Sequence, residues 1–117
     1  MKPLEKIKLF WDFTRPFTLV APALGFISGG ITAIGSGHRP GIGFLQKIDW
    51  SHDLTFIVLG SLMAATLNAA SNVLNQVYDL SIDKFNKPNR PLCTGIISIK
   101  SAKIYATLLY GLALLLA

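Results

Sequence analysis

The residues best suited to chemistry are two aspartates preceded by regularly spaced amides. Asp79 and Asp83 are four residues apart, and three asparagines precede them at intervals of three or four: Asn68, Asn72 and Asn75. On a helix that continues through Asp83, all five fall within a roughly 80° arc, and the carboxylates lie about 6 Å apart along the axis. Bare acids on one face repel each other, and magnesium is commonly held by one or two carboxylates with phosphate oxygens. The spacing predicts a magnesium site in which each acid takes its own ion or both flank one cluster.

A short basic segment after the acids supplies the charge that a diphosphate needs. Residues 84–91 read KFNKPNRP, so Lys87 and Arg90 come one to two helical turns after Asp83. A planar guanidinium matches phosphate oxygens, and the prolines on either side of Arg90 end the helix and stiffen the loop. We therefore expect Lys87 and Arg90 to bind diphosphate. The alternative, that they only set membrane topology, stays open.

The elements that carry these residues are those of a membrane protein. The chain has 117 residues, of which 51% are hydrophobic and 15% charged, whereas about a quarter are charged in soluble domains. No charge lies between Pro16 and Gly37 or between Leu54 and Tyr78, and each run exceeds the roughly 20 residues of a membrane-spanning helix. A third uncharged run, 104–117, is too short to span. These runs predict an all-α transmembrane bundle with two complete spans and the start of a third, in a chain that we expect to be part of a longer protein.

The predicted elements follow from these runs. In order they are a surface helix at about 3–14, a span at about 17–34, an outer loop at 35–53, a span at about 54–78 that extends to the aspartates, a cytoplasmic loop at about 84–100, and a partial span at 101–117. The first span carries small residues at intervals that suit close helix contact, namely Ala21, Gly25, Ser28, Gly29 and Ala33.

The basic residues predict the orientation of the spans. Four precede the first span, two lie between the first and second, and five lie between the second and third. This alternation places the N-terminus and the aspartate loop on the cytoplasmic side. The net charge of +5 is thus a topology signal, and we expect no nucleic-acid partner. Cys93 is the only cysteine, which excludes an internal disulfide and a cysteine-based metal site.

The polar segments together resemble a known family. Residues 75–83 (NQVYDLSID), followed by NKPNRPL at 86–92 and by Gly95, resemble the first aspartate-rich motif of the UbiA-type intramembrane prenyltransferases. The Arg15-Pro16 pair that opens the first span looks like the early Arg-Pro of that family. The resemblance implies a bundle of about nine spans around a cavity, where two aspartate-rich motifs bind magnesium together with an isoprenyl diphosphate.

Carried over by position, the resemblance assigns roles to residues of this chain. It implies that Asp79 and Asp83 are catalytic and bind magnesium with Asn75, which also contacts the diphosphate. It further implies diphosphate contacts from Lys87, Arg90 and Arg15; the first two are those expected above from charge. Asn72 is expected to support this site from behind, or else to form only interhelical hydrogen bonds, the role favoured for Asn68. Arg15 is equally consistent with a contact to lipid head groups.

The resemblance also sets the expected reaction and its limits. It implies a magnesium-dependent transfer of a prenyl group to an aromatic or quinone-precursor acceptor, or alternatively to a glycerolipid phosphate or a tetrapyrrole. Many relatives have Asp at the position of Gln76. The Asn75-Gln76 pair of this chain instead looks like the homogentisate-type branch. The second aspartate motif belongs to helices absent from the chain, so we expect the chain alone to be inactive. Outside the enzyme class, a transporter or a small membrane adaptor remains, although a transporter would not need the basic segment after the acids.

Overall fold

The structure is a computed structural model that describes residues 1–36 and 49–117. All regular structure in these residues is helical, which confirms the all-α prediction. The elements are α1 (Pro3–Phe13), the short 3₁₀ helix η1 (Pro16–Leu19), α2 (Val20–Gly35), α3 (Trp50–Tyr78), α4 (Leu80–Asn86), α5 (Pro91–Thr94) and α6 (Ile99–Leu116). The predicted outer loop falls mostly on residues 37–48, outside the described ranges.

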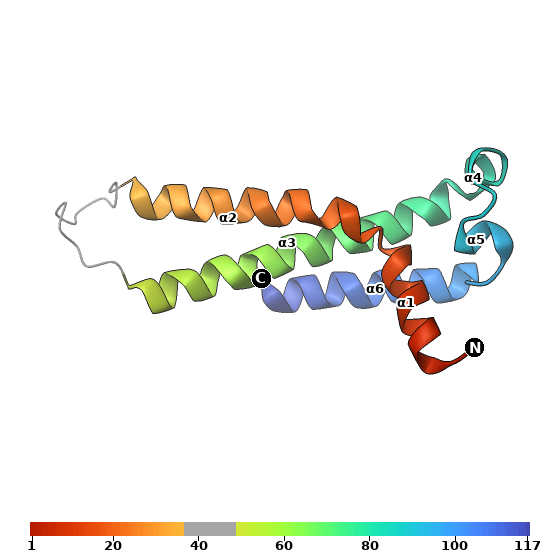
Figure 1. The fold of residues 1–117 in the computed structure, drawn as a ribbon, viewed down its shortest axis with the longest axis horizontal. Coiled ribbons are helices and arrows are strands. Elements are labelled where there is room, and N and C mark those ends of the chain that lie inside the picture. Colours follow the sequence, from red (N-terminus) through yellow and green to blue (C-terminus); the bar gives the residue numbers. More distant parts are fainter. Residues whose placement is uncertain (37–48) are drawn as a thin grey trace.

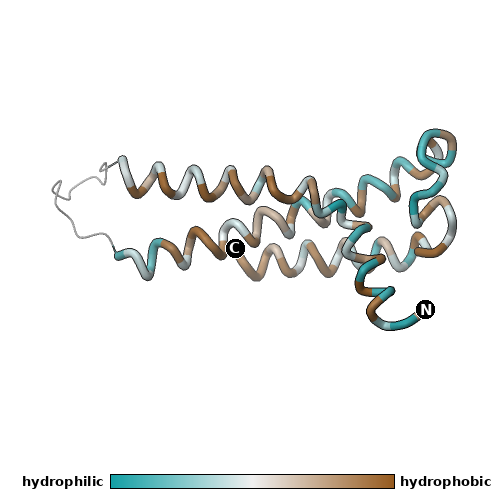
Figure 2. The backbone as a smooth tube through the Cα atoms, in the orientation of Figure 1, coloured by the Kyte–Doolittle hydropathy of each residue, from teal (hydrophilic) through white to brown (hydrophobic). Residues whose placement is uncertain are grey.

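Three long helices run side by side, with α3 in the middle (Figure 1). Helix α3 packs against both α2 and α6, while α1 crosses the bundle steeply at the end that also carries α4 and α5. Three segments are long and apolar enough to cross a membrane: Pro16–Gly35, Trp50–Tyr78 and Ile99–Leu116. Figure 2 shows the apolar residues along these segments and the hydrophilic ones around α4 and the segment that follows it.

Two helices begin earlier than predicted because polar residues cap them. Asp49 accepts a hydrogen bond from the backbone N–H of His52 at 3.1 Å, so α3 begins at Trp50 rather than near residue 54. Ser98 likewise accepts from the backbone N–H of Ser101 at 3.1 Å. Helix α6 therefore begins at Ile99 and has 18 residues. This start lies two residues before the predicted one at residue 101, and the helix includes Lys100 and Lys103 in its first turns.

The chain breaks between α1 and the first span at Arg15-Pro16. Pro16 has no backbone N–H and disfavours the helical conformation of the residue before it. Arg15 leaves the helical region and adopts a left-handed conformation with φ 57° and ψ 64°, the sole positive φ among the described residues other than glycine. We call residues 13–18 the break. It lets the short 3₁₀ helix η1 start the first span in a new direction, away from α1.

Helices α2 and α3 meet through glycines, although not those predicted. A Cβ atom added at Gly60 would lie 2.0 Å from the ring of Phe26, and one added at Gly30 would lie 2.6 Å from the Ile57 side chain. Each glycine therefore admits a large side chain of the facing helix. The predicted small-residue stripe instead lies on an exposed side of α2, and a Cβ at Gly25 would meet nothing within 4 Å. The periodicity was real, but it does not mark the contact with α3.

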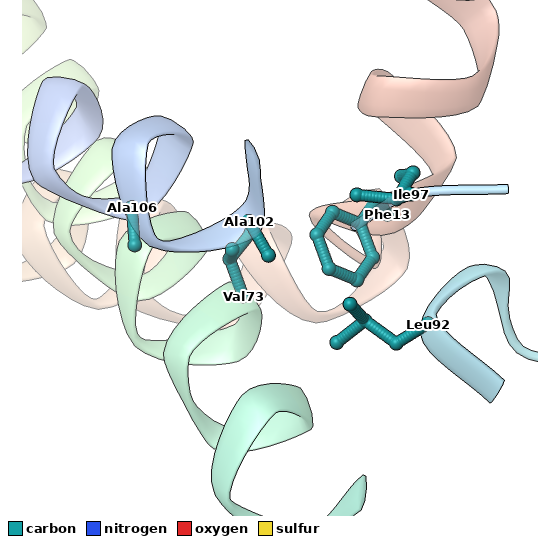
Figure 3. Packing of buried hydrophobic residues seen from close by; sticks show 6 residues of the cluster. All are labelled: Phe13, Val73, Leu92, Ile97, Ala102 and Ala106. Carbon is teal, nitrogen blue, oxygen red and sulfur yellow. The ribbon is translucent and has the colours of Figure 1, made fainter. Parts of the chain in front are cut away.

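A compact apolar core lies beneath the polar end of the bundle. Figure 3 shows six buried side chains drawn from α1, α3, α6 and the segment around α5, namely Phe13, Val73, Leu92, Ile97, Ala102 and Ala106. Phe13 is the last residue of α1, and Leu92 directly follows the basic segment. The break and the basic segment therefore share one core.

Candidate functional site

The first aspartate lies at a joint between two helices. Helix α3 ends at Tyr78, and Asp79 has φ −87° and ψ 7° before α4 begins at Leu80. The hydrogen bonds from Asp79 N to Asn75 O and from Asp83 N to Asp79 O, both 2.8 Å, continue across the joint. Figure 1 nevertheless shows α4 turned out of the line of α3. The condition of one straight helix through Asp83 is therefore not met, since aspartate favours caps and turns over helix interiors.

The two aspartates have different surroundings because of this turn. The side chains of Asn75 and Asp79 are exposed, whereas Asp83 is buried at 7% exposure. The carboxylate of Asp83 accepts a short hydrogen bond from Nη1 of Arg90. The acid and the cation thus form an ion pair in which 10% and 20% of the respective side chains are exposed. Asp83 compensates the charge of Arg90, while Asp79 presents its oxygens outward.

The basic segment is held by its own backbone and by helix α5. The N–H of Arg90 donates to the carbonyl of Lys87 at 3.1 Å, and Arg90 is the residue just before α5. Pro91 starts α5, and Gly95 ends it in the left-handed conformation at φ 80°, which glycine adopts at little cost. This loop brings Arg90 back beside Asp83. Lys87 is exposed, so its side chain can contact solvent or a ligand.

The amides in the last turns of α3 bind the break rather than forming one face with the acids. Nε2 of Gln76 donates to the carbonyl of Phe13 at 2.8 Å, and Nδ2 of Asn72 donates to the carbonyl of Thr14 at 2.9 Å. Both carbonyls lack the helical partners that they would have if α1 continued. The interhelical alternative raised for Asn72 is therefore present in the structure. Gln76, 5% exposed, was given no role from the sequence, although it lies one turn after Asn72.

Asn68 binds a third backbone carbonyl that lacks its usual hydrogen-bond donor. Pro22 has no N–H to offer the carbonyl of Thr18 four residues earlier, and Nδ2 of Asn68 donates to that carbonyl at 3.0 Å. The Thr18 hydroxyl also accepts from Asn72 at 2.7 Å. This confirms the interhelical role expected of Asn68. It also shows how a proline is tolerated in a span, since a neighbouring side chain satisfies the freed carbonyl.

Arg15 follows directly after the two carbonyls held by Asn72 and Gln76. Its side chain is exposed. Because Gln76 is the neighbour of Asn75 in α3, these hydrogen bonds fix the backbone of Arg15 near the end of α3 from which Asn75 and Asp79 emerge. The structure thus brings the break, the end of α3 and the basic segment to one end of the bundle.

The exposed oxygen atoms suit a hard cation that is coordinated by both the protein and a substrate. No group of three or more His, Cys, Asp or Glu side chains that could hold a metal occurs in residues 1–36 and 49–117. A closed protein cage is therefore not formed by these residues. Magnesium needs less, because it keeps several waters and takes one or two carboxylates plus phosphate oxygens. The carboxylate of Asp79 and the amide oxygen of Asn75 are ligands of this type, so the residues present fit that ion.

Comparisons with known proteins match these features. Residues 41–117 match the model of the UbiA prenyltransferase family. The digeranylgeranylglyceryl phosphate synthase of Saccharolobus solfataricus is 34% identical over 110 residues, which are 92% of this chain and 34% of that protein. The corresponding synthase of Metallosphaera sedula is 38% identical over 79 residues, or 68% of this chain and 27% of that protein.

A plant enzyme is also similar. The homogentisate geranylgeranyltransferase of Hordeum vulgare is 36% identical over 101 residues, which cover 82% of this chain and 21% of that protein. The chain thus spans between about a fifth and about a third of the length of these curated relatives. No solved structure matches. The family model covers well over half of the chain, and the chain belongs to the UbiA prenyltransferase family.

Proposed function

We propose that the protein transfers a prenyl group from an isoprenyl diphosphate to a lipophilic acceptor, and that this chain supplies the first half of its magnesium-dependent site. The observation that carries the proposal is the chemistry at one end of α3. There the exposed side chains of Asn75 and Asp79 precede Asp83 by two turns and one turn of the chain, and Asp83 binds Arg90 of the basic segment. Apolar helices offer the prenyl chain surroundings like lipid, while their polar end receives the diphosphate.

Each side chain has a role that its surroundings support. Asn75, Asp79 and Asp83 supply oxygens to magnesium. The bond from Arg90 uses Oδ2 of Asp83, which leaves Oδ1 as an acceptor. The Arg90 guanidinium has five N–H donors, so it can bind a phosphate oxygen while Asp83 holds it.

Lys87 and Arg15, both exposed, add two further cations for the diphosphate. Asn72 supports the site from behind, since it holds the backbone carbonyl of Thr14 next to Arg15.

The reaction follows from the charge that develops on the leaving group. As the allylic C–O bond breaks, its electron pair leaves with the diphosphate, and positive charge develops on the prenyl carbon. Arg90 and Lys87 donate N–H groups to the diphosphate oxygens, which gain charge in the transition state. Magnesium, when bound, supplies further charge neutralisation there. The acceptor then attacks the prenyl carbon and releases a proton, in surroundings from which the apolar helices exclude water.

The relatives narrow the substrates. Both kinds of relative are named for a geranylgeranyl group, so we take geranylgeranyl diphosphate as the donor. Homogentisate is the first acceptor candidate, because Gln76 follows Asn75 as in the homogentisate-type branch. A geranylgeranylated glyceryl phosphate is the second, because several similar archaeal proteins are synthases of digeranylgeranylglyceryl phosphate.

The proposal includes a membrane setting and further helices. We place the N-terminus and the aspartate loop on the cytoplasmic side, in keeping with the distribution of basic residues. The N-terminus and helices α4 and α5 lie at the same end of the bundle, which supports one shared side (Figure 1). A second aspartate motif on the remaining helices would complete the site.

The test is a transfer assay with the complete open reading frame expressed in membranes. Membranes are incubated with labelled geranylgeranyl diphosphate, magnesium and either acceptor, and product is compared between the parent protein, Asp79→Ala and Asp12→Asn. Asp12 is an exposed acid in α1 and serves as the matched control. We expect Asp79→Ala and removal of divalent cations each to abolish transfer, while Asp12→Asn retains it. Equal product from Asp79→Ala, or full activity in excess EDTA, would overturn the proposal.

A further inference from the structure

Three amides of α3 donate hydrogen bonds that the reaction itself does not use. We call Asn68, Asn72 and Gln76 the amide clamp. Their nitrogen atoms donate to the carbonyls of Thr18, Thr14 and Phe13 at 3.0, 2.9 and 2.8 Å. All three carbonyls lie in the break, where proline or the end of α1 has removed the usual backbone donor.

We propose that the amide clamp positions Arg15 for the diphosphate, with Gln76 as its principal positioning residue. This inference rests on the proposed function. The two carbonyls held by Gln76 and Asn72 belong to the residues immediately before Arg15. Arg15 itself adopts a left-handed conformation, which residues other than glycine rarely adopt unless their surroundings enforce it. The clamp contributes to that enforcement, because it holds the two carbonyls before Arg15 against α3.

Gln76 couples the break to the metal-binding end of α3 through its place in the chain. It is 5% exposed, so its amide is shielded from water that could replace it. Its neighbour Asn75 is exposed on α3, and Asp79 follows one turn later. A shift of the Phe13 carbonyl would therefore move Arg15 relative to Asn75 and Asp79. The chemistry also explains the amide, because a carboxylate at position 76 has no N–H to donate and would repel the carbonyl of Phe13.

Two substitutions separate the donor group from the size of the side chain. Gln76→Glu keeps the shape and removes the N–H donor, while Gln76→Met removes the donor without adding a charge. Each is compared with Ser71→Ala, which deletes a half-buried α3 hydroxyl that lies 3.3 Å from the Tyr110 hydroxyl of α6 and does not touch the break. The complete open reading frame is used, and binding of a non-cleavable geranylgeranyl thiolodiphosphate is measured with magnesium present, together with KM for donor and acceptor.

We expect Gln76→Glu to weaken analogue binding and raise the donor KM by about tenfold to a hundredfold. This is the effect of losing one charge-assisted hydrogen bond, here that of Arg15 with the diphosphate. The acceptor KM stays unchanged. Gln76→Met shifts both donor quantities in the same direction by a smaller factor, and Ser71→Ala shifts neither. Because the clamp acts through Arg15, Arg15→Ala weakens donor binding similarly, and adding Gln76→Glu to it produces no further loss.

Two results would overturn the clamp. One is unchanged donor binding in both Gln76 variants when these remain folded, as judged by thermal unfolding. The other is a double variant with Arg15→Ala in which the two losses multiply. Asp79→Ala separates this failure from failure of the proposed function. If Asp79→Ala loses transfer but the Gln76 and Arg15 effects are independent, only the clamp is wrong. If Asp79→Ala transfers normally, the site itself is wrong.

Discussion

Replacing Arg90 with glutamine tests whether the ion pair with Asp83 holds the basic segment in place. The substitution leaves the carboxylate of Asp83, 10% exposed, without its cation. Removing one partner of a fully buried pair costs about 3–5 kcal/mol, whereas exposed pairs contribute about 0–1 kcal/mol. With a fifth of the Arg90 side chain exposed, we expect Arg90→Gln to lower the free energy of unfolding by about 2 kcal/mol. Such a loss corresponds to a decrease in Tm of about 4–8 °C for a protein of 150–250 residues, and of about twice that for a domain of 60–100 residues.

A double-mutant cycle isolates the pair from other effects of each substitution. Asp83→Asn removes the acid and leaves the more exposed Arg90 partly hydrated, so it costs about 1 kcal/mol. The double variant then costs little more than Asp83→Asn alone, because no unpaired acid remains. Thermal unfolding of the detergent-solubilised protein measures all four states, with the exposed neighbour Lys84→Gln as a control expected within about 0.5 kcal/mol of the parent.

Additive costs would refute this account of the loop. If the double variant loses the sum of the two single losses, within about 0.3–0.5 kcal/mol, then Asp83 and Arg90 do not interact in the folded protein. A loss for Arg90→Gln no larger than that for Lys84→Gln has the same meaning. In either case the placement of Arg90 beside Asp83 would need another cause.

Three further predictions test the fold and the site. Gly60→Ala lowers the free energy of unfolding by about 1–3 kcal/mol, because its Cβ would lie 2.0 Å from the Phe26 ring. The control Gly25→Ala, whose Cβ meets nothing within 4 Å, leaves Tm unchanged or raises it. Equal Tm values for both variants would contradict the packing of α2 on α3. Gly95→Ala lowers the free energy of unfolding, and with it Tm, because a left-handed alanine costs about 1 kcal/mol. An unchanged Tm would exclude the left-handed conformation at this position. Arg90→Ala raises the donor KM about tenfold or more, while Lys100→Ala, also a cation near this end, leaves it unchanged.

The membrane fold was predictable because it depends on composition over long runs. A span needs only about 20 apolar residues, and each of the three candidate spans overlaps one of the uncharged runs. The helix starts were less accessible, because the spans were bounded by their uncharged runs, whereas a charged residue such as Asp49 can cap a helix. The contact face of α2 was missed for a different reason. Small residues permit close contact, but only the facing helix decides which of them are used, as Phe26 and Gly60 illustrate.

The candidate site was predictable in its residues but not in its geometry. A helical projection assumes uniform dihedral angles, and Asp79 departs from them. The pairing of Asp83 with Arg90 depends on the path of the loop back from residue 87, which no periodicity encodes. The hydrogen bonds of Asn72 and Gln76 depend on backbone carbonyls 58 and 63 residues away in the chain. A proline that frees a carbonyl in a span could have signalled the need for such a donor, as Pro22 does for Thr18.

The proline at position 22 has a consequence for how the protein enters the bilayer. The carbonyl of Thr18 finds its hydrogen atom on Asn68, a residue made 50 positions later in synthesis. In hydrocarbon, a peptide oxygen without such a donor costs several kcal/mol. We therefore expect the first two spans to enter the lipid together. The first span would stay at the insertion machinery until the second span has been synthesised. Biogenesis and the final fold would then depend on the same hydrogen bond between Asn68 and Thr18.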